Sequence, residues 1–130
     1  MDVHECVSFI LLNESKVLLE NRSESKETDP GLITIPGGHI EHGENQVQTL
    51  FRELDEELNV VPIDYQYLCS LYHPTKELQL IHYFIVSDWE GDITAQEADD
   101  VKWYSLGSAP VGIAADGIAL KEVERVGKYL

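Results

Sequence analysis

The chain carries little positive charge. Its 130 residues include 9 lysines and arginines against 24 aspartates and glutamates, which gives a formal net charge of −15. Binding to DNA or RNA rests on neutralising many phosphates with Lys and Arg, so the composition argues against a nucleic-acid polymer as partner. A small phosphorylated ligand that arrives with a divalent cation remains compatible with this charge. Most of the acidic residues are expected to form a solvated surface.

Cysteine is scarce, and long apolar runs are missing. Cys6 and Cys69 have neither CxxC spacing nor nearby paired histidines, so we expect no zinc site or redox motif and interpret both as small buried hydrophobic residues. No apolar run approaches the roughly 20 residues that span a bilayer, and the chain does not begin with the basic stretch of a secretory signal. We therefore expect a cytoplasmic protein without a membrane partner.

Internal repeats, low-complexity tracts and Pro/Ser-rich linkers are also missing from the sequence. Because 43% of the residues are hydrophobic, a chain of this length can bury a core without disulfides or structural metal. These features predict one domain over residues 1–130.

Alternating apolar residues and turn-forming residues predict the order of the secondary-structure elements. The chain should run from strands to a helix, then to further strands and a second helix. Strands are expected at residues 3–12, 17–19, 32–35, 65–71, 78–86 and 101–104, a polar surface loop at 21–31, and helices at 44–58 and 117–130.

The first of these helices combines an apolar stripe with clustered carboxylates. Glu53 lies one helical turn before both Glu56 and Glu57, which places three carboxylates within reach of one ion. Hard oxygen ligands suit Mg²⁺ or Mn²⁺, and Mg²⁺ in proteins is commonly shared with substrate phosphates. A solvated acidic helix face is the competing interpretation. The apolar stripe consists of Val47, Leu50, Leu54 and Leu58.

A glycine pair precedes this helix by a few residues. Gly37 and Gly38 follow Pro36, so the backbone there can bend tightly and expose a carbonyl or amide group. The pair would be a weak signal by itself, since Pro-Gly-Gly is commonly a plain turn. The spacing between the glycines and the carboxylates favours a metal site over the solvated face.

Residues 38–60 resemble the signature of the Nudix hydrolase family, GX5EX7REUXEEXGU, in which U is aliphatic. The match covers 23 of the 130 residues: Gly38, five residues, Glu44, seven residues, then the run from Arg52 to Val60. Asn59 stands where the family usually has glycine. Asn tolerates the left-handed conformation that ends helices, so the helix cap can survive this difference.

The resemblance implies a fold, a reaction and a set of roles. The Nudix fold is an α/β (α+β) sandwich with a mixed β-sheet between helices, and the reaction is hydrolysis of a nucleoside diphosphate linked to X with Mg²⁺, or Mn²⁺ as a substitute. Glu53, Glu56 and Glu57 look like metal-binding and water-activating carboxylates, with a backbone carbonyl of Gly37 or Gly38 completing the site. Arg52 would orient a glutamate. Glu44 would support the loop–helix junction or bind metal from an outer position.

Three residues outside the box are further candidates. Glu97 lies six residues before Trp103, and small MutT-like nucleoside triphosphatases place a metal-binding carboxylate at similar spacing; an exposed acidic loop is the alternative. Asp116 precedes the expected last helix, where such enzymes often carry a residue that reads a purine edge, and it could equally be an N-cap. Arg22 could grip a phosphate or be a surface residue.

The first of three candidate functions is a MutT-like (d)NTP pyrophosphohydrolase that releases (d)NMP and pyrophosphate, with oxidised nucleotides among its candidate substrates. The second is an ADP-ribose or other nucleotide-sugar pyrophosphatase. That group tends to place a proline about 15 residues beyond the box, and Pro74 lies 14 residues beyond Val60. The third is a non-catalytic nucleotide-sensing module, although such modules usually lose box carboxylates. The chain could also form a homodimer.

Overall fold

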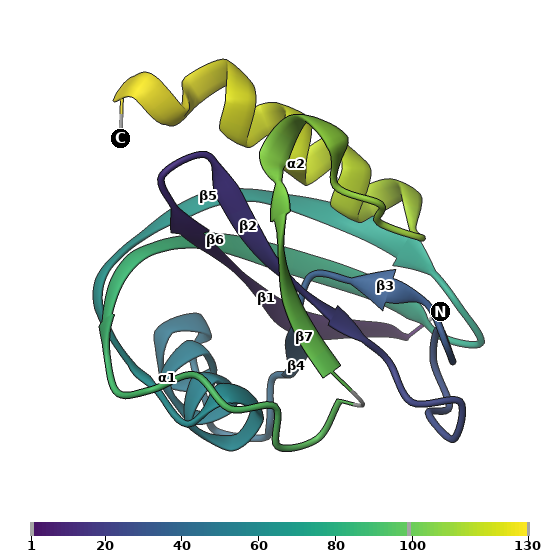
Figure 1. Cartoon of the computed structure of the whole chain (residues 1–130). Coiled ribbons are helices and arrows are strands. Elements are labelled where there is room, and N and C mark those ends of the chain that lie inside the picture. The colour runs from purple at the N-terminus through teal and green to yellow at the C-terminus, as the bar shows by residue number, and fades with distance from the viewer. Residues whose placement is uncertain (1, 99, 130) are drawn as a thin grey trace.

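A computed structural model describes residues 2–98 and 100–129 (Figure 1). Within this part of the chain, seven strands form one mixed sheet in the order β3-β2-β1-β6-β5, with β4 paired to β1 and β7 paired to β2. The strands are β1 (Val3–Asn13), β2 (Lys16–Asn21), β3 (Ile33–Thr34), β4 (Gly37–His39), β5 (Val61–Pro74), β6 (Leu78–Glu90) and β7 (Asp100–Ser105), and the helices are α1 (Gln46–Leu58) and α2 (Ala114–Val126), with short 3-10 turns at Leu106–Ser108 and Gly127–Tyr129.

The sheet combines two kinds of strand pairing. β1 and β6 are parallel over nine residue pairs, from Val3 opposite Leu78 to Leu11 opposite Val86, whereas the other pairs are antiparallel. β1 and β2 form an antiparallel hairpin at the first two expected strands, and Glu14 in its turn has a positive φ of 58°. Parallel neighbours need a long connection, and here the segment between β1 and β6 contains α1 and residues 36–38, called the glycine loop below, whose two glycines begin β4.

The two helices cover opposite faces of the sheet (Figure 1). On one face α1 buries Leu50, Leu54 and Leu58 against β1 and β6, and on the other α2 buries Ala119 and Leu120. Each fully buried leucine side chain contributes about 1.5–3 kcal/mol relative to exposure. The predicted sandwich of a mixed sheet between helices is therefore confirmed.

Both ends of α1 are capped by asparagines. Asn45 accepts a hydrogen bond from the Gln48 amide, and the Gln48 side chain accepts from the Asn45 amide, so the helix begins at Gln46 and not at the expected residue 44. At the other end Asn59 adopts φ 61° and ψ 38°, the left-handed conformation expected where the family usually has glycine.

Several sequence expectations need correction. α2 begins at Ala114 behind the N-cap position Ile113, so the N-cap interpretation of Asp116 is wrong: this residue lies in the first helical turn, where a carboxylate complements the helix dipole. Cys6 is buried as expected, but Cys69 is only half-buried. Val47 of the predicted apolar stripe is 38% exposed. The predicted final residue of the last helix, Leu130, lies outside the described residues. None of the described helices is long and apolar enough to cross a membrane.

Candidate active site

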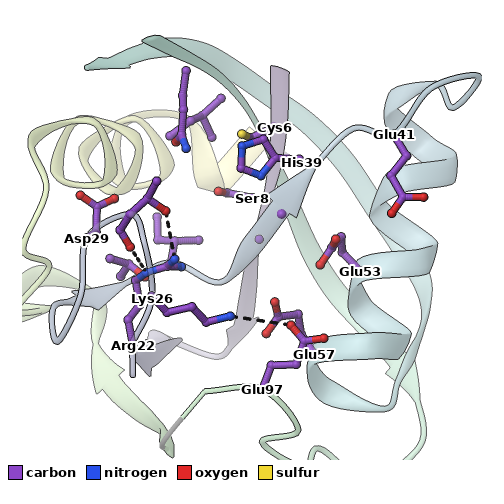
Figure 2. Close-up of a pocket in the computed structure, with 17 residues that line it drawn as sticks. Cys6, Ser8, Arg22, Lys26, Asp29, His39, Glu41, Glu53, Glu57 and Glu97 are labelled. Carbon is purple, nitrogen blue, oxygen red and sulfur yellow. Dashed lines mark hydrogen bonds and ion pairs between the residues drawn. The ribbon is translucent and has the colours of Figure 1, made fainter. Parts of the chain in front are cut away.

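A cleft of about 270 Å³ opens where the glycine loop and α1 meet the end of the sheet (Figure 2). Its lining contains six of the site residues predicted from sequence and several that were not predicted. The predicted ones that line it are Arg22, Gly37, Gly38, Glu53, Glu57 and Glu97. The unpredicted ones include Cys6, Ser8, Lys26, Asp29, His39 and Gln79.

The two glycines are sterically required at the cleft. A Cβ atom added to Gly37 would lie 2.2 Å from the Val7 carbonyl oxygen, and one added to Gly38 would lie 2.3 Å from the Glu53 carboxyl carbon. The loop is held in place because β4 pairs with β1, with Ser8 opposite Gly37. The backbone of the loop therefore packs directly against the Glu53 carboxylate, which only glycine permits.

Arg52 is the centre of an ion-pair network beside the cleft. Its guanidinium donates to Glu44 twice, with Nε–Oε2 at 2.6 Å and Nη2–Oε1 at 2.9 Å. It also donates to Glu53 at 2.8 Å and Glu56 at 3.1 Å, and to the His39 carbonyl at 2.9 Å. A planar guanidinium with several donors can hold these acceptors at once, and the role of Arg52 in orienting a glutamate stays a prediction.

Glu44 joins the glycine loop to the helix. Besides its two bonds to Arg52, its Oε1 accepts from the Glu41 amide at 3.0 Å and from the Thr49 hydroxyl at 2.9 Å. These hydrogen bonds, with that from Arg52 foremost, lower the pKa of Glu44 to about 2. The carboxylate thus stays ionised and connects the loop to the helix; its supporting role in the reaction stays a prediction.

Glu53 and Glu57 are buried carboxylates of α1 that face the cleft. Each is only 7% exposed, although an acidic residue of this kind is rarely buried without a partner. Burial raises the pKa of both groups; for Glu57 the charge of Glu20 adds to the effect, followed by Glu97 and Glu53. The negative charges therefore repel one another, and a positive ion among them would relieve the repulsion.

Glu97 is brought to this group by the loop between β6 and β7. The loop amides of Thr94 and Gln96 donate to the carbonyls of Leu58 and Glu57, each at 3.0 Å. The Gln96 side chain donates to the carbonyls of Asp55 and Glu56 at 2.6 Å and 2.8 Å. The last carbonyls of α1 therefore accept hydrogen bonds from this loop, and the Asp55 carbonyl also accepts from the Asn59 amide at 3.1 Å.

Two basic side chains reach the acidic group from the loop after β2. Arg22 donates to Glu20 at 3.1 Å and to the Thr28 carbonyl at 3.0 Å, so in this structure the guanidinium is held within its own loop. Lys26 forms an ion pair of 3.9 Å with Glu97 (Figure 2). Glu20 was missed by the sequence interpretation, although a charged residue directly after Val17-Leu18-Leu19 in a strand could have signalled it.

Four predicted site residues do not line the cleft: Arg52 and Glu44 form the network described above, and Glu56 and Asp116 also lie outside the lining. The Glu56 side chain is 44% exposed and reaches the cluster only through Arg52. Asp116 is 1% exposed, and its two carboxylate oxygens accept from the Ile35 amide at 2.9 Å and the Tyr83 hydroxyl at 2.7 Å. The structure therefore groups Glu53, Glu57 and Glu97 at the cleft, with Glu56 beside them and Asp116 behind the cleft wall formed by Ile35.

The residues at the cleft fit a divalent cation. The side-chain donors are carboxylate oxygens, which Mg²⁺ and Mn²⁺ prefer, and the missing Cβ of Gly38 lets the Glu53 carboxylate lie directly beside the loop backbone and its carbonyl groups. Among residues 2–98 and 100–129 no three histidine, cysteine or acidic side chains already form a ligand set. Mg²⁺ in proteins commonly takes few carboxylates and completes its shell with water and substrate phosphates.

Comparisons with known proteins agree with this geometry. The family model of the NUDIX domain matches residues 2–122. The 8-oxo-dGTP diphosphatase of Escherichia coli (strain K12) is 30% identical over 108 residues, which cover 82% of this chain and 81% of that protein. The CTP pyrophosphohydrolase of the same organism is 31% identical over 106 residues, which cover 81% of this chain and 78% of that protein.

A solved structure shows the same fold. The crystal structure of a MutT NUDIX hydrolase from Burkholderia pseudomallei superposes with a TM-score of 0.85 at 20% identity, covering 95% of this chain and 99% of that chain. The chain belongs to the Nudix family. Within it, the chain is a MutT-like hydrolase that acts on phosphoric anhydride bonds.

Proposed function

We propose that the chain hydrolyses nucleoside triphosphates, (d)NTP, to (d)NMP and pyrophosphate in the presence of Mg²⁺. One observation carries the proposal: the buried carboxylates Glu53 and Glu57 face the glycine loop in a cleft that also contains Arg22 and Lys26. The first pair suits a cation, and the second pair suits the phosphates that such a cation accompanies. The names of the two enzymes described above, a dGTP-derivative diphosphatase and a CTP pyrophosphohydrolase, support this substrate class.

The residues divide the chemistry between them. Glu53, Glu57, Glu97 and the carbonyl of Gly37 or Gly38 would hold the cation, with Glu56 as a further ligand. When bound, the cation neutralises the phosphate chain and makes water a better nucleophile. Mn²⁺ shares the preference for oxygen ligands and is expected to substitute.

Glu53 is assigned as the proton acceptor of the reaction. Water adds across the anhydride bond between the α and β phosphates: its oxygen bonds to phosphorus, the bridging oxygen leaves with the other phosphate, and the proton passes to the carboxylate. Burial raises the pKa of Glu53 from its ordinary value, which makes it a stronger base, while the hydrogen bond from Arg52 would keep it oriented. Arg22 would hold the phosphate chain once released from Glu20 and Thr28.

The test is product analysis with a broad panel of substrates. The protein and its Glu53→Gln variant are incubated with dNTPs, 8-oxo-dGTP, ADP-ribose and dinucleoside polyphosphates, with Mg²⁺ or with EDTA. We expect (d)NMP and pyrophosphate from the triphosphates, no turnover with EDTA, and a loss of at least about 100-fold in kcat for Glu53→Gln. Glu90→Gln, at an exposed position of β6, is the matched control and should retain full activity.

Two outcomes would overturn the proposal. Release of AMP and ribose 5-phosphate as the dominant products would identify a nucleotide-sugar pyrophosphatase. Binding of nucleotides without turnover of any substrate would identify a sensing module.

A further inference from the structure

Gln79 is a buried polar residue of the cleft that the hydrolytic residues do not use. It lies near the start of β6, opposite His4 of β1 and His73 of β5, and is only 6% exposed. Its side chain nevertheless lines the cleft, next to Cys6 and Ile81. A buried carboxamide needs partners for both its oxygen and its nitrogen, so its contacts reveal which atom is free.

The orientation of this carboxamide is set by Glu77. The Gln79 Nε2 atom donates to Glu77 Oε1 at 3.1 Å, and the same carboxylate contacts His39 Nε2 at 2.5 Å and His4 Nδ1 at 3.3 Å. The hydrogen bond from His39 is the main reason that the pKa of Glu77 is lowered. Because an ionised carboxylate only accepts hydrogen bonds, the amide nitrogen must face Glu77 and the carbonyl oxygen must face away from it.

The carbonyl oxygen of Gln79 is open to the cleft. Within residues 2–98 and 100–129, no donor bonds to this oxygen, and no fully covered side-chain oxygen or nitrogen is left without a partner. Because every fully covered polar side-chain atom described has a partner and this oxygen has none, the oxygen must be partly open to solvent. The open space beside Gln79 is the cleft that it lines. The molecule therefore presents one fixed hydrogen-bond acceptor on the cleft wall.

The position of this acceptor relates it to the base of a nucleotide. Figure 2 shows Cys6 and Asp29 on the side of the cleft away from Glu53 and Glu57. A substrate with its phosphates at the carboxylates directs its base toward that side, where Cys6 and Ile81 offer apolar contact. The second polar group there, Asp29, already bonds to His73 through Oδ2 at 2.9 Å.

We propose that the Gln79 carbonyl oxygen accepts a hydrogen bond from an exocyclic amino group of the base, and so selects amino-bearing bases over their oxo or unsubstituted counterparts. This inference rests on the proposed nucleoside triphosphate hydrolysis. A keto oxygen brought to the same place would meet the lone pairs of the Gln79 oxygen and leave two acceptors unpaired. Leaving these buried groups unpaired should lower kcat/KM for the oxo base by about 10- to 100-fold relative to the amino-bearing base.

The test compares kcat/KM within substrate pairs that differ at one amino group: CTP with UTP, ATP with ITP, and GTP with ITP. The wild-type protein should favour the amino-bearing member of at least one pair by about 10-fold or more. Gln79→Leu, which keeps the volume and removes the acceptor, should bring that ratio close to one. In Glu77→Gln the carboxamide can turn either way, so the ratio should fall part of the way.

Controls keep the result specific. Gln66→Leu makes the same chemical change at an exposed position of β5 and should keep the wild-type ratio. Circular dichroism and unfolding midpoints show whether each variant is folded, and Gln79→Met replaces Gln79→Leu if the latter is not. The inference is overturned by a wild-type ratio near one in every pair, or by a folded Gln79 variant that keeps the wild-type preference.

Failure of the proposed triphosphate hydrolysis can be distinguished from failure of the inference about Gln79. If the wild-type protein hydrolyses no triphosphate, calorimetric binding of the same pairs replaces kinetics. A binding preference for the amino-bearing nucleotide that Gln79→Leu removes would support the inference alone, whereas equal binding or no binding would overturn it.

Discussion

The buried carboxyl group of Asp116 gives a quantitative prediction about folding stability. Burial raises the pKa of this group from its ordinary value of 3.8 to about 6, against the opposing hydrogen bonds from the Ile35 amide and the Tyr83 hydroxyl. The perturbation is Asp116→Asn. An asparagine oxygen can still accept from Ile35, and its NH₂ group can donate to the Tyr83 oxygen, so the variant keeps the geometry and removes only the ionisation.

The sign of the pH dependence follows from the two pKa values. Between about pH 4 and about pH 6 the folded protein holds a proton on Asp116 that the unfolded chain has released, so stability falls as the pH rises through this window. Over a pH change that spans both pKa values, this difference lowers the free energy of unfolding by about 3 kcal/mol. Integrated between about pH 5 and about pH 8, the loss is about 1.4 kcal/mol. The chain has a pI near 4.5, so it carries net negative charge throughout this range.

The assay is urea unfolding of both proteins at several pH values across that range. The free energy of unfolding of Asp116→Asn minus that of the wild type should increase by about 1.4 kcal/mol from about pH 5 to about pH 8. His73 lies close enough to influence Asp116, but it is present in both proteins and largely cancels in the difference. Asp64→Asn, at an exposed position of β5, serves as the control and should show a constant difference. A constant difference for Asp116→Asn as well would refute the reasoning.

Two further substitutions test the catalytic geometry. Gly38→Ala pushes the Glu53 carboxylate out of position, since the new Cβ would lie 2.3 Å from its carboxyl carbon; we expect kcat to fall about 100-fold in steady-state kinetics, and wild-type kcat would contradict the steric argument. Arg52→Lys cannot hold Glu44 by two bonds and Glu53 at once, so kcat should fall about 10- to 100-fold, whereas exposed Arg125→Lys should match the wild type. Equal kcat for both lysine variants would show that the guanidinium hydrogen bonds of Arg52 to Glu44 and Glu53 are not needed for catalysis.

Local spacing made the acidic network predictable from the sequence. Glu44, Arg52 and Glu53 lie within ten residues of one another, on a helix and the turn before it, so helical geometry alone brings them together. The same holds for the cap at Asn59, whose left-handed conformation depends on a preference of that residue type. Interactions of this kind can be predicted without knowledge of the rest of the fold.

Contacts between distant segments could not be predicted in this way. Asp116 bonds to Ile35 across 81 sequence positions, and Lys26 meets Glu97 only because two loops lie at the same end of the sheet. The parallel pairing of β1 with β6 brings Cys6 beside Ile81, an arrangement that no local pattern encodes. The start of α2 was misjudged for another reason, because no side chain at Ile113 caps it and the usual N-terminal signal is missing.

The loop that carries Glu97 is bonded through its backbone and Gln96 to the last carbonyls of α1. Consequently the end of this helix and the loop gain or lose their order together, as one unit of local unfolding. A substitution that loosens the loop would also fray the helical turn on which Glu57 stands. Tolerance to sequence change in residues 91–96 is thus set by the demands of the helix, even though this segment lies some forty residues further along the chain.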